Sequence, residues 1–225
     1  MMTQFLSDSP IVVFDLDDTL YKEIDYLYSA YHEIAGYLCA GGHVPDDPFP
    51  RMLGWYRQGR NVFQSLNDYY GLDIPIVSLL ALYRNHVPNI ALDPEVEQTL
   101  SELCRDGCVL GLISDGRSIT QRNKIAALGL DRFVRDDCII ISEEIGSEKP
   151  DALNYLAIQQ KFPGRRFFYV GDNPQKDFIA PNSLKWMTIC VLDDGRNIHK
   201  QDFSLEKQFL PRAIVSTIDQ ISQYL

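Results

Sequence analysis

Short apolar runs rich in branched or aromatic residues recur along the chain. They occupy residues 11–14, 109–113, 139–141, 167–170 and 188–192. Runs of this length and composition are typical of strands buried on both faces of a parallel sheet. Helix-length amphipathic stretches follow the later runs, at 118–128, 151–161 and 175–186. The alternation predicts βαβ units, and therefore an α/β fold with a doubly wound, Rossmann-like parallel sheet.

The segment from Tyr21 to about Leu92 interrupts this alternation. It offers helix-like stretches at 24–40, 49–58, 61–70 and 74–86 and no convincing strand. We therefore expect two domains, an α/β core of residues 1–20 plus 93–225 and a small helical domain of residues 21–92. Asp93-Pro94 should begin the next helix, with Asp as N-cap and Pro at the first helical position. The end of the chain, 213–225, should form a short strand and a final helix.

Composition and charge narrow the possible partners. The 225 residues are 45% hydrophobic, and 21 basic against 31 acidic residues give a net charge of -10. This excess of negative charge disfavours nucleic acid and acidic membrane surfaces as partners. The five cysteines are scattered and odd in number, which argues against a disulfide framework and for a reducing, cytoplasmic setting. We expect no secretion signal and no membrane span.

Two acids follow the first predicted strand. In the sequence D-L-D-D-T-L, Asp15 and Asp17 are two positions apart on extended backbone and should project to the same side. Ligands of open α/β sheets bind beyond the carboxyl ends of the strands, where these acids lie. The D-x-D spacing alone also arises by chance, so its position after an apolar strand carries the interpretation.

Polar residues follow the later strands too. The second strand ends in L-I-S-D-G, which places Ser114 at the same edge, with Gly116 permitting a sharp turn. A capping or turn-forming serine is the plain alternative. Lys149 stands before a helix expected at Pro150, where its charge is unfavourable to the helix dipole and hints at an anionic partner. A solvated surface lysine would explain it equally well.

The fourth strand ends in Y-V-G-D-N-P-Q-K-D and supplies Asp172 and Asp177. Asp172 alone would pass for a helix N-cap. However, four successive strand ends supply two acids, a hydroxyl, an ammonium group and two more acids, and independent structural accidents would not converge in this way. Clustered carboxylates repel one another unless a cation lies among them, and oxygen ligands of this kind suit Mg²⁺. The sequence therefore predicts a magnesium site.

The four segments D-L-D-D-T-L, I-S-D-G, E-K-P and G-D-N-P-Q-K-D, in this order, resemble the four motifs of the haloacid dehalogenase-like hydrolases. The resemblance spans roughly residues 11 to 195. It implies a magnesium-dependent phosphatase that forms an aspartyl-phosphate, with the helical segment as a cap inserted after motif one. Two positions depart from the pattern of many relatives, at Ala180-Pro181 and at Lys185-Trp186.

The resemblance also implies a role for each motif residue. Asp15 would be the nucleophile and Asp17 the general acid and base. Ser114, Asp115 and Lys149 would bind the substrate, with Ser114 and Lys149 on the phosphoryl oxygens. The metal would be held by Asp15, Asp172 and the backbone carbonyl of Asp17. Supporting roles would fall to Thr19, Gly116 and Asp177, the last of these orienting the metal shell or Lys149.

Elementary chemistry agrees with these roles. A carboxylate with an ordinary pKa of ~3.9 is ionised at neutral pH, so Asp15 needs no base to attack phosphorus. Asp17 must protonate the leaving alkoxide and later deprotonate water, and crowding by neighbouring carboxylates would raise its pKa for this task.

The helical segment offers few clues to the substrate. Most tyrosines of the chain lie there, and we interpret them mainly as the core of a small helical domain rather than as a stacking surface. Arg57, Arg60 and His86 are candidates to meet a second anionic group. The substrate should be a small phosphorylated metabolite, a sugar phosphate or a nucleotide, and the protein a monomer or a weak homodimer. Gly41-Gly42 and the segment 91–94 are candidate hinges.

Other functions stay open on the sequence. A phosphomutase of the same family would use the same motifs. A dehalogenase is disfavoured, because Asp17 and the metal acids have no task in displacing halide from carbon. From a different class, a non-catalytic phosphate-responsive regulatory protein resembling a receiver domain would also use Asp, Ser or Thr, Lys and Mg²⁺, but its acidic pair would precede the phosphoacceptor.

Overall fold

The computed structural model describes residues 9–225, so the first eight residues of the expected core lie outside the described part. Its centre is a six-stranded sheet in the order β3-β2-β1-β4-β5-β6, and every adjacent pair is parallel. The predicted Rossmann-like α/β class is therefore confirmed. The strands are β1 Ile11–Phe14, β2 Val109–Ser114, β3 Val134–Ile141, β4 Phe167–Gly171, β5 Met187–Val191 and β6 Ala213–Val215.

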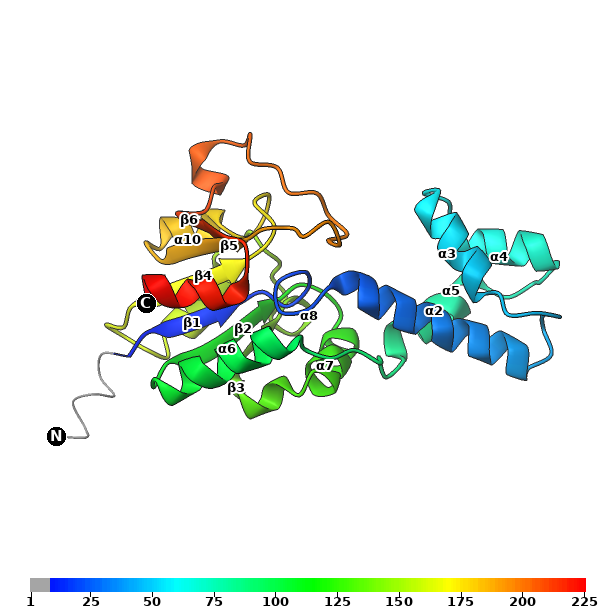
Figure 1. Ribbon diagram of the computed structural model, residues 1–225, viewed down its shortest axis with the longest axis horizontal. Coiled ribbons are helices and arrows are strands. Elements are labelled where there is room, and N and C mark those ends of the chain that lie inside the picture. Colours follow the sequence, from blue (N-terminus) through cyan, green and yellow to red (C-terminus); the bar gives the residue numbers. More distant parts are fainter. Residues whose placement is uncertain (1–8) are drawn as a thin grey trace.

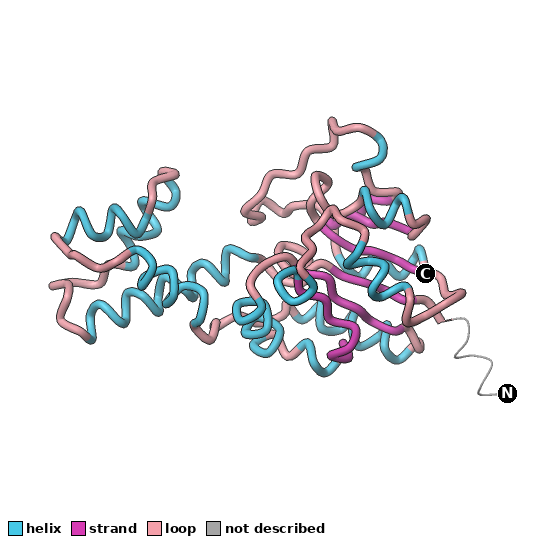
Figure 2. Tube along the Cα trace, turned by 180° about the vertical axis from the view of Figure 1, so that it is seen from behind, coloured by secondary structure: helices cyan, strands magenta, loops and turns pink. Residues whose placement is uncertain are grey.

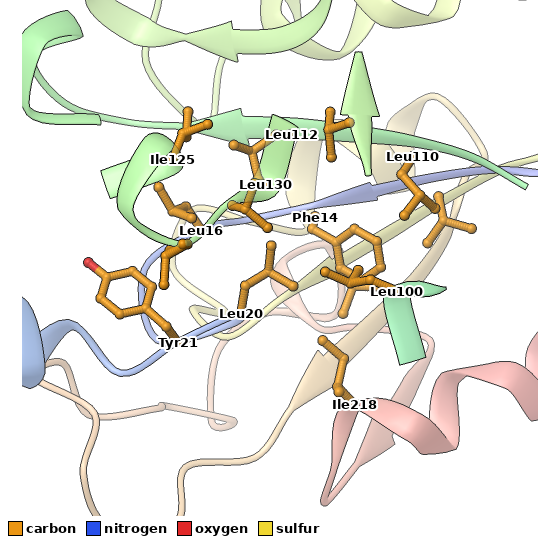
Figure 3. Packing of buried hydrophobic residues seen from close by; sticks show 14 of the residues in the cluster. Phe14, Leu16, Leu20, Tyr21, Leu100, Leu110, Leu112, Ile125, Leu130 and Ile218 are labelled. Carbon is orange, nitrogen blue, oxygen red and sulfur yellow. The ribbon is translucent and has the colours of Figure 1, made fainter. Parts of the chain in front are cut away.

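Strand β1 shows why the apolar runs are continuous. Val12 and Phe14 pack into one hydrophobic cluster, and Ile11 and Val13 pack into another on the opposite face of the sheet. Successive side chains of a strand point to opposite faces, so a strand covered on both sides must be apolar at every position. Figure 3 shows the first cluster, with Phe14 beside Leu100 and Leu110.

Helices cover both faces of the sheet. One face carries α6 (Pro94–Arg105), α7 (Ser118–Ala127) and the 3₁₀ helix η3 (Ile218–Tyr224), and the other carries α9 (Leu153–Gln159) and α10 (Ile179–Ser183). The short helices are η1 (Leu130–Arg132), α8 (Ser142–Ile145) and η2 (Lys207–Phe209). Pro94 is the first residue of α6, as expected, although the Asp93 side chain makes no capping hydrogen bond.

One predicted helix is much shorter than expected. The stretch 175–186 contains only α10, and residues 174–178 form turns in which the Asp177 N-H bonds to the Asn173 carbonyl. Pro174 and Pro181 limit helix formation here, and the Asp177 side chain folds back onto the loop that follows β4. Because the helix is short, Asp177 lies in a turn before it and contributes to the site.

The segment that interrupts the βα alternation forms four helices, as predicted. They are α2 (Glu23–Ala40), α3 (Phe49–Arg57), α4 (Val62–Tyr70) and α5 (Ile76–Asn85), and they enclose their own hydrophobic cluster. Figures 1 and 2 show this group extending beyond the end of the sheet toward which the carboxyl end of β1 points. Among the described residues, no helix has the length and apolar character needed to cross a membrane.

Aromatic rings fill the interior of the helical group. Tyr31 lies edge-on to Tyr56 and Phe63, with ring centroids 6.4 Å apart in both pairs, and Phe63 lies in the same way against Tyr83. This confirms the interpretation of these rings as core. Gly41-Gly42 joins α2 to α3 inside the helical group, so it is not a hinge toward the sheet, and that expectation was wrong.

Candidate active site

The site lies at the carboxyl ends of three neighbouring strands. β1 is paired with β2 on one side and β4 on the other, so Asp15, Ser114 and Asp172 reach the same edge of the sheet. All three residues are buried. The Asp15 N-H also donates to the carbonyl of Val170 at 2.8 Å, which continues the β1–β4 ladder into the loop.

The loop after β1 is anchored by its apolar residues. Leu16 and Leu20 are buried in the core beneath the site (Figure 3), while the acids between them face away from that core. Asp18 adopts a left-handed backbone conformation with φ 57°, which turns the loop sharply after Asp17. The alternation of Leu and Asp in this motif therefore serves both the core and the site.

Lys149 is buried among oxygen atoms. Its ammonium group lies 2.6 Å from Oδ1 of Asp15, 2.8 Å from Oδ1 of Asp177 and 3.2 Å from the Tyr169 hydroxyl. Burial lowers the pKa of Lys149, but the Asp15 and Asp177 carboxylates outweigh this effect and hold it well above its usual value. Helix α9 begins only at Leu153, so the argument from the helix dipole was wrong, and the anionic partners of Lys149 include two carboxylates of the protein.

Asp177 shapes the loop that carries Asp172. Its Oδ2 accepts hydrogen bonds from the backbone N-H groups of Asp172 and Asn173, at 3.2 and 2.8 Å. Gly171 is required at this turn, because a Cβ atom there would lie 2.6 Å from the same oxygen. Burial favours a higher pKa for Asp177, yet the two nearby lysines and these hydrogen bonds hold it below the usual value.

Asp15, Asp172 and Asp177 form a tight acidic cluster, with one oxygen of each within 4.8 Å of the others. Burial raises the pKa of Asp15 to about 6, although the Lys149 ammonium opposes the rise. Burial, the Asp177 carboxylate and the Asp15 carboxylate raise the pKa of Asp172 to about 9. Asp172 would thus be protonated at neutral pH unless a cation lay beside it, which is the behaviour expected of a carboxylate that binds a hard metal ion. The donor set of Asp15 and Asp172 therefore fits Mg²⁺.

Asp17 has partners that the sequence analysis did not identify. Its Oδ1 lies 2.7 Å from the Lys124 ammonium and accepts a hydrogen bond from the Tyr21 hydroxyl at 2.5 Å, while its Oδ2 accepts from the Gln121 amide at 3.0 Å. Burial alone would raise the pKa of Asp17, but Lys124 and these hydrogen bonds hold it below the usual value. The expected rise from neighbouring carboxylates is therefore reversed in this conformation.

The remaining predicted residues lie around the same edge. The Ser114 hydroxyl accepts from the Gln121 amide at 3.0 Å, and Asp115 accepts from the Lys149 backbone N-H at 3.0 Å. Gly116 has φ 140°, and a Cβ there would lie 2.9 Å from the Gln121 amide nitrogen. Thr19 is buried, and its hydroxyl has no hydrogen-bond partner among the described residues. Through its hydrogen bond with the backbone N-H of Lys149, the carboxylate of Asp115 positions that lysine.

A small cavity of about 110 Å³ opens onto these residues. Its lining contains Asp15, Asp17, Asp18, Glu23, Asp115, Asp172, Asn173, Lys176 and His199. Lys176 also forms an ion pair with Asp115 at 3.4 Å. Six carboxylates line the cavity, and Lys176 is the one lysine in this lining. A phosphate group that entered would therefore need a metal ion and lysine charge to offset repulsion.

Two of the candidates for a second anion site, His86 and Arg60, make contacts within the helical group. His86 is buried, and its ring nitrogens lie 2.9 Å from the Tyr83 carbonyl and 3.1 Å from the Ser29 hydroxyl. The Arg60 guanidinium lies over the Trp55 ring at 5.7 Å. The proposal of an anionic subsite at His86 is therefore not supported by its contacts.

Sequence reasoning missed several residues that hold the site, namely Tyr21, Gln121, Lys124, Lys176 and Asn197. One signal was available. Gln121 and Lys124 are three positions apart in the predicted helix, so they share one face of it. The apolar residues Ile125 and Leu128 lie on the same face, which packs into the core, so two polar residues interrupt an apolar surface. A buried lysine on such a face needs an anionic partner, and Asp17 is that partner.

Comparison with known proteins identifies the family. A family model described as haloacid dehalogenase-like hydrolase matches residues 12–191. The chain belongs to this family. Among solved structures, the magnesium-bound HAD-hydrolase YfnB of Bacillus subtilis superposes with a TM-score of 0.68 at 18% identity, covering 97% of this chain and 99% of the other. The 2-haloacid dehalogenase of Pseudomonas syringae gives 0.63 at 19% identity, with 96% and 97% covered. At these identities the likeness concerns the fold.

Curated relatives are phosphatases. The glyceraldehyde 3-phosphate phosphatase of Methanocaldococcus jannaschii is 29% identical over 193 residues, which are 80% of this chain and 84% of that protein. The phosphatase of the same name from Methanopyrus kandleri is 23% identical and covers 94% of this chain and 98% of its own length. Together with the family membership, these relatives identify the chain as an enzyme, a hydrolase of phosphate monoesters.

Proposed function

We propose that this hydrolase dephosphorylates a small phosphorylated metabolite in a Mg²⁺-dependent reaction that passes through an aspartyl-phosphate at Asp15. One observation carries the proposal. Asp15 is buried at the carboxyl end of β1, its Oδ1 lies 2.6 Å from the Lys149 ammonium, and beside it is a second buried acid, Asp172, whose pKa is raised by burial and by the neighbouring carboxylates. This arrangement suits a nucleophile that must approach an anionic phosphorus centre.

The first half-reaction uses the ionised Asp15. Because Lys149 is bound to Oδ1, we assign Oδ2 as the attacking atom. A bond forms between Oδ2 and phosphorus while the ester P-O bond breaks, and the leaving alkoxide takes its proton from Asp17. With a pKa of about 6, Asp15 is still mostly ionised at neutral pH, so it needs no base of its own.

The second half-reaction reverses the role of Asp17. Its carboxylate takes a proton from water, the resulting hydroxide attacks phosphorus, and the bond to Asp15 breaks to release inorganic phosphate. Lys124, Tyr21 and Gln121 hold Asp17 ionised in this conformation, which suits the base step. For the acid step, the incoming phosphate would raise the pKa of Asp17 by adding negative charge nearby.

A metal ion and lysine side chains would balance the negative charge of the carboxylates and of the bound phosphate group in the cavity. Asp15, Asp172 and the backbone carbonyl of Asp17 would hold Mg²⁺, which supplies positive charge to the phosphoryl oxygens when bound. Ser114 would donate its hydroxyl proton to one of these oxygens, while its Oγ continues to accept from Gln121. Lys176, which lines the cavity, would add the second ammonium charge.

The substrate that we propose to test first is glyceraldehyde 3-phosphate. Three archaeal relatives carry that activity in their names, at 29%, 23% and 25% identity. The cavity of about 110 Å³ favours a short molecule over a nucleotide. This choice refines the broader expectation of a sugar phosphate or a nucleotide.

We also propose that residues 21–92 act as a cap domain on a core of residues 1–20 plus 93–225. Two chain connections join the helical group to the sheet, one before α2 and one between α5 and α6. Tyr21 of the first connection belongs to the site, and Glu23, the first residue of α2, lines its cavity. Closure of the helical group over the cavity would exclude water during formation of the aspartyl-phosphate.

The decisive experiment is an assay of the purified protein with glyceraldehyde 3-phosphate, other sugar phosphates, phosphoserine and nucleotides, with Mg²⁺ and with EDTA. We expect phosphate release only with the metal, and fastest with a three-carbon substrate. Rapid acid quench followed by peptide mass spectrometry should locate a phosphoryl group on Asp15. Equal rates in EDTA, or no phosphoryl group on Asp15 in any quenched sample with a good substrate, would overturn the mechanism.

A further inference from the structure

The loop of residues 193–201, which follows β5, reaches from Asp172, the acid that we assign to Mg²⁺, to the start of the helical group. In Figure 1 it is the orange segment that extends from the sheet toward the first turn of α2, and Figure 2 shows the same approach from behind. Its two contacts with Asp172 are hydrogen bonds from the Asn197 amide to Oδ2 at 3.0 Å and from the Gln201 amide to the backbone carbonyl at 2.7 Å. The loop therefore contacts both the side chain and the backbone of a residue that we assign as a ligand of Mg²⁺.

Both ends of the Asn197 side chain are engaged. Nδ2 donates to Asp172, and Oδ1 accepts from the Lys22 ammonium at 2.8 Å. The Asn197 backbone N-H donates to Oδ1 of Asp193 at 2.9 Å, and the Gly195 N-H donates to the same oxygen at 2.8 Å. The side-chain amide is thus fixed in orientation by partners on two sides, and its N-H group is directed at the carboxylate.

The same loop is tied to the first residues of the helical group. Asp18 accepts from the Ile198 N-H with one oxygen and from the Glu23 N-H, at the start of α2, with the other, both at 2.9 Å. Arg196 forms an ion pair with Asp25 at 2.6 Å, and Lys22 forms one with Asp194 at 3.2 Å. A movement of α2 relative to the sheet would therefore act on this loop as well.

We propose that Asn197 is a positioning residue for the metal ligand Asp172, and that Lys22 links it to the entrance of the helical group. The inference rests on the proposed Mg²⁺ site. A carboxylate that gives one oxygen to a metal presents its other oxygen to a hydrogen-bond donor, and such donors fix the ligand in the geometry that the metal needs. The Asn197 amide supplies that donor at Oδ2, and Lys22 holds the amide in place from the opposite side.

The test measures metal binding directly, without substrate. Mn²⁺ is titrated into the purified full-length protein, and bound and free ion are separated by electron paramagnetic resonance, with Mg²⁺ competition to obtain its Kd. Asn197→Ala and the near-isosteric Asn197→Leu should each raise the Kd about 10- to 100-fold, the range found for residues that orient metal ligands. Lys22→Met should give a smaller rise of roughly 3- to 10-fold, because it removes only the second partner.

Two controls separate positioning from a general structural effect. Arg196→Gln breaks an exposed ion pair in the same loop without touching Asp172, and it should leave the Kd unchanged. The melting temperature of each Asn197 variant should stay close to that of the wild type while the Kd rises. Wild-type affinity in both Asn197 variants, or an equal rise in Arg196→Gln, overturns the inference.

A failure of the proposed function would look different. In that case the wild-type protein itself would bind no Mn²⁺, or would bind it with the same affinity after Asp172→Asn.

Discussion

The Lys124 ammonium lies 2.7 Å from Oδ1 of Asp17, with a lysine side chain that is only 3% exposed. Lys124 belongs to α7, on the sheet side, and it also lies 4.4 Å from the centre of the Tyr26 ring and 3.9 Å from Glu23, both in α2. One buried cation thus contacts the proposed acid-base residue and the first turns of the helical group. The position of Asp17 and the attachment of α2 therefore depend on the same charge.

Lys124→Met should destabilise the protein by about 3 kcal/mol, because it leaves the partly buried Asp17 carboxylate without its buried cation. Urea unfolding monitored by circular dichroism measures the change. Lys207→Met, at an exposed position, serves as the control and should have almost no effect. In a double-mutant cycle with Asp17→Asn, we expect a coupling of at least ~1 kcal/mol. Strict additivity of the two single changes would show that the pair does not interact.

Asp15→Asn should abolish turnover, because an amide cannot form the aspartyl-phosphate. Asp17→Asn should lower kcat by about 10²- to 10⁴-fold, the range of general acid-base catalysis, because the leaving group then departs unprotonated. Steady-state phosphate release measures both. Asp131→Asn, on the surface, is the control and should behave as the wild type. Unchanged activity in either site variant refutes the assignment of that residue.

Hydrophobic periodicity was sufficient to place the motif residues. Asp15, Ser114 and Asp172 each follow or end an apolar run, and parallel strands bring their carboxyl ends to one edge. Their convergence could therefore be predicted without a structure. The fold class follows from the same periodicity, since strands buried on both faces leave an unmistakable apolar pattern.

Side-chain partners from other elements could not be predicted in the same way. The pKa of Asp17 was expected to rise through crowding by neighbouring carboxylates, whereas the lowering comes from Lys124, 107 positions away along the chain. Asn197 lies in a loop with no periodic pattern, and its contact with Asp172 depends on how that loop crosses the sheet edge. Such contacts are set by tertiary packing, which local pattern does not encode.

Lys176→Met should raise the KM for the phosphate ester about tenfold, the equivalent of ~1.5 kcal/mol for one hydrogen bond to a charged group. Lys176 lines the cavity as its one lysine, so its loss leaves six carboxylates facing the anion. The inhibition constant for inorganic phosphate should rise in parallel, and Lys176→Arg should restore much of both. If phosphate inhibits the methionine variant as strongly as the wild type, Lys176 does not contact the phosphate.

His86 gives the connection between α5 and α6 a dependence on pH. Its Nδ1 donates to the Tyr83 carbonyl, and its Nε2 accepts from the Ser29 hydroxyl, which itself accepts from the Asn89 N-H at 2.8 Å. Burial lowers the pKa of His86, the Tyr83 carbonyl and the Glu33 carboxylate oppose the lowering, and the Lys124 ammonium adds to it. The folded protein thus favours the neutral ring.

In the unfolded chain, the histidine ring takes up a proton at a pKa of about 6.5. The stability contributed by neutral His86 is therefore complete above that pH. It is lost as the pH falls toward the lower pKa that His86 has in the folded protein. His86→Gln should cost ~1 kcal/mol at pH 7.5 through the lost hydrogen bonds. The difference from the wild type should shrink at about pH 5, since the variant has no proton to gain there. Urea unfolding at both pH values measures this, with His43→Gln, at an exposed position, as the control. A difference that stays constant between the two pH values would mean that His86 titrates equally in the folded and unfolded chains.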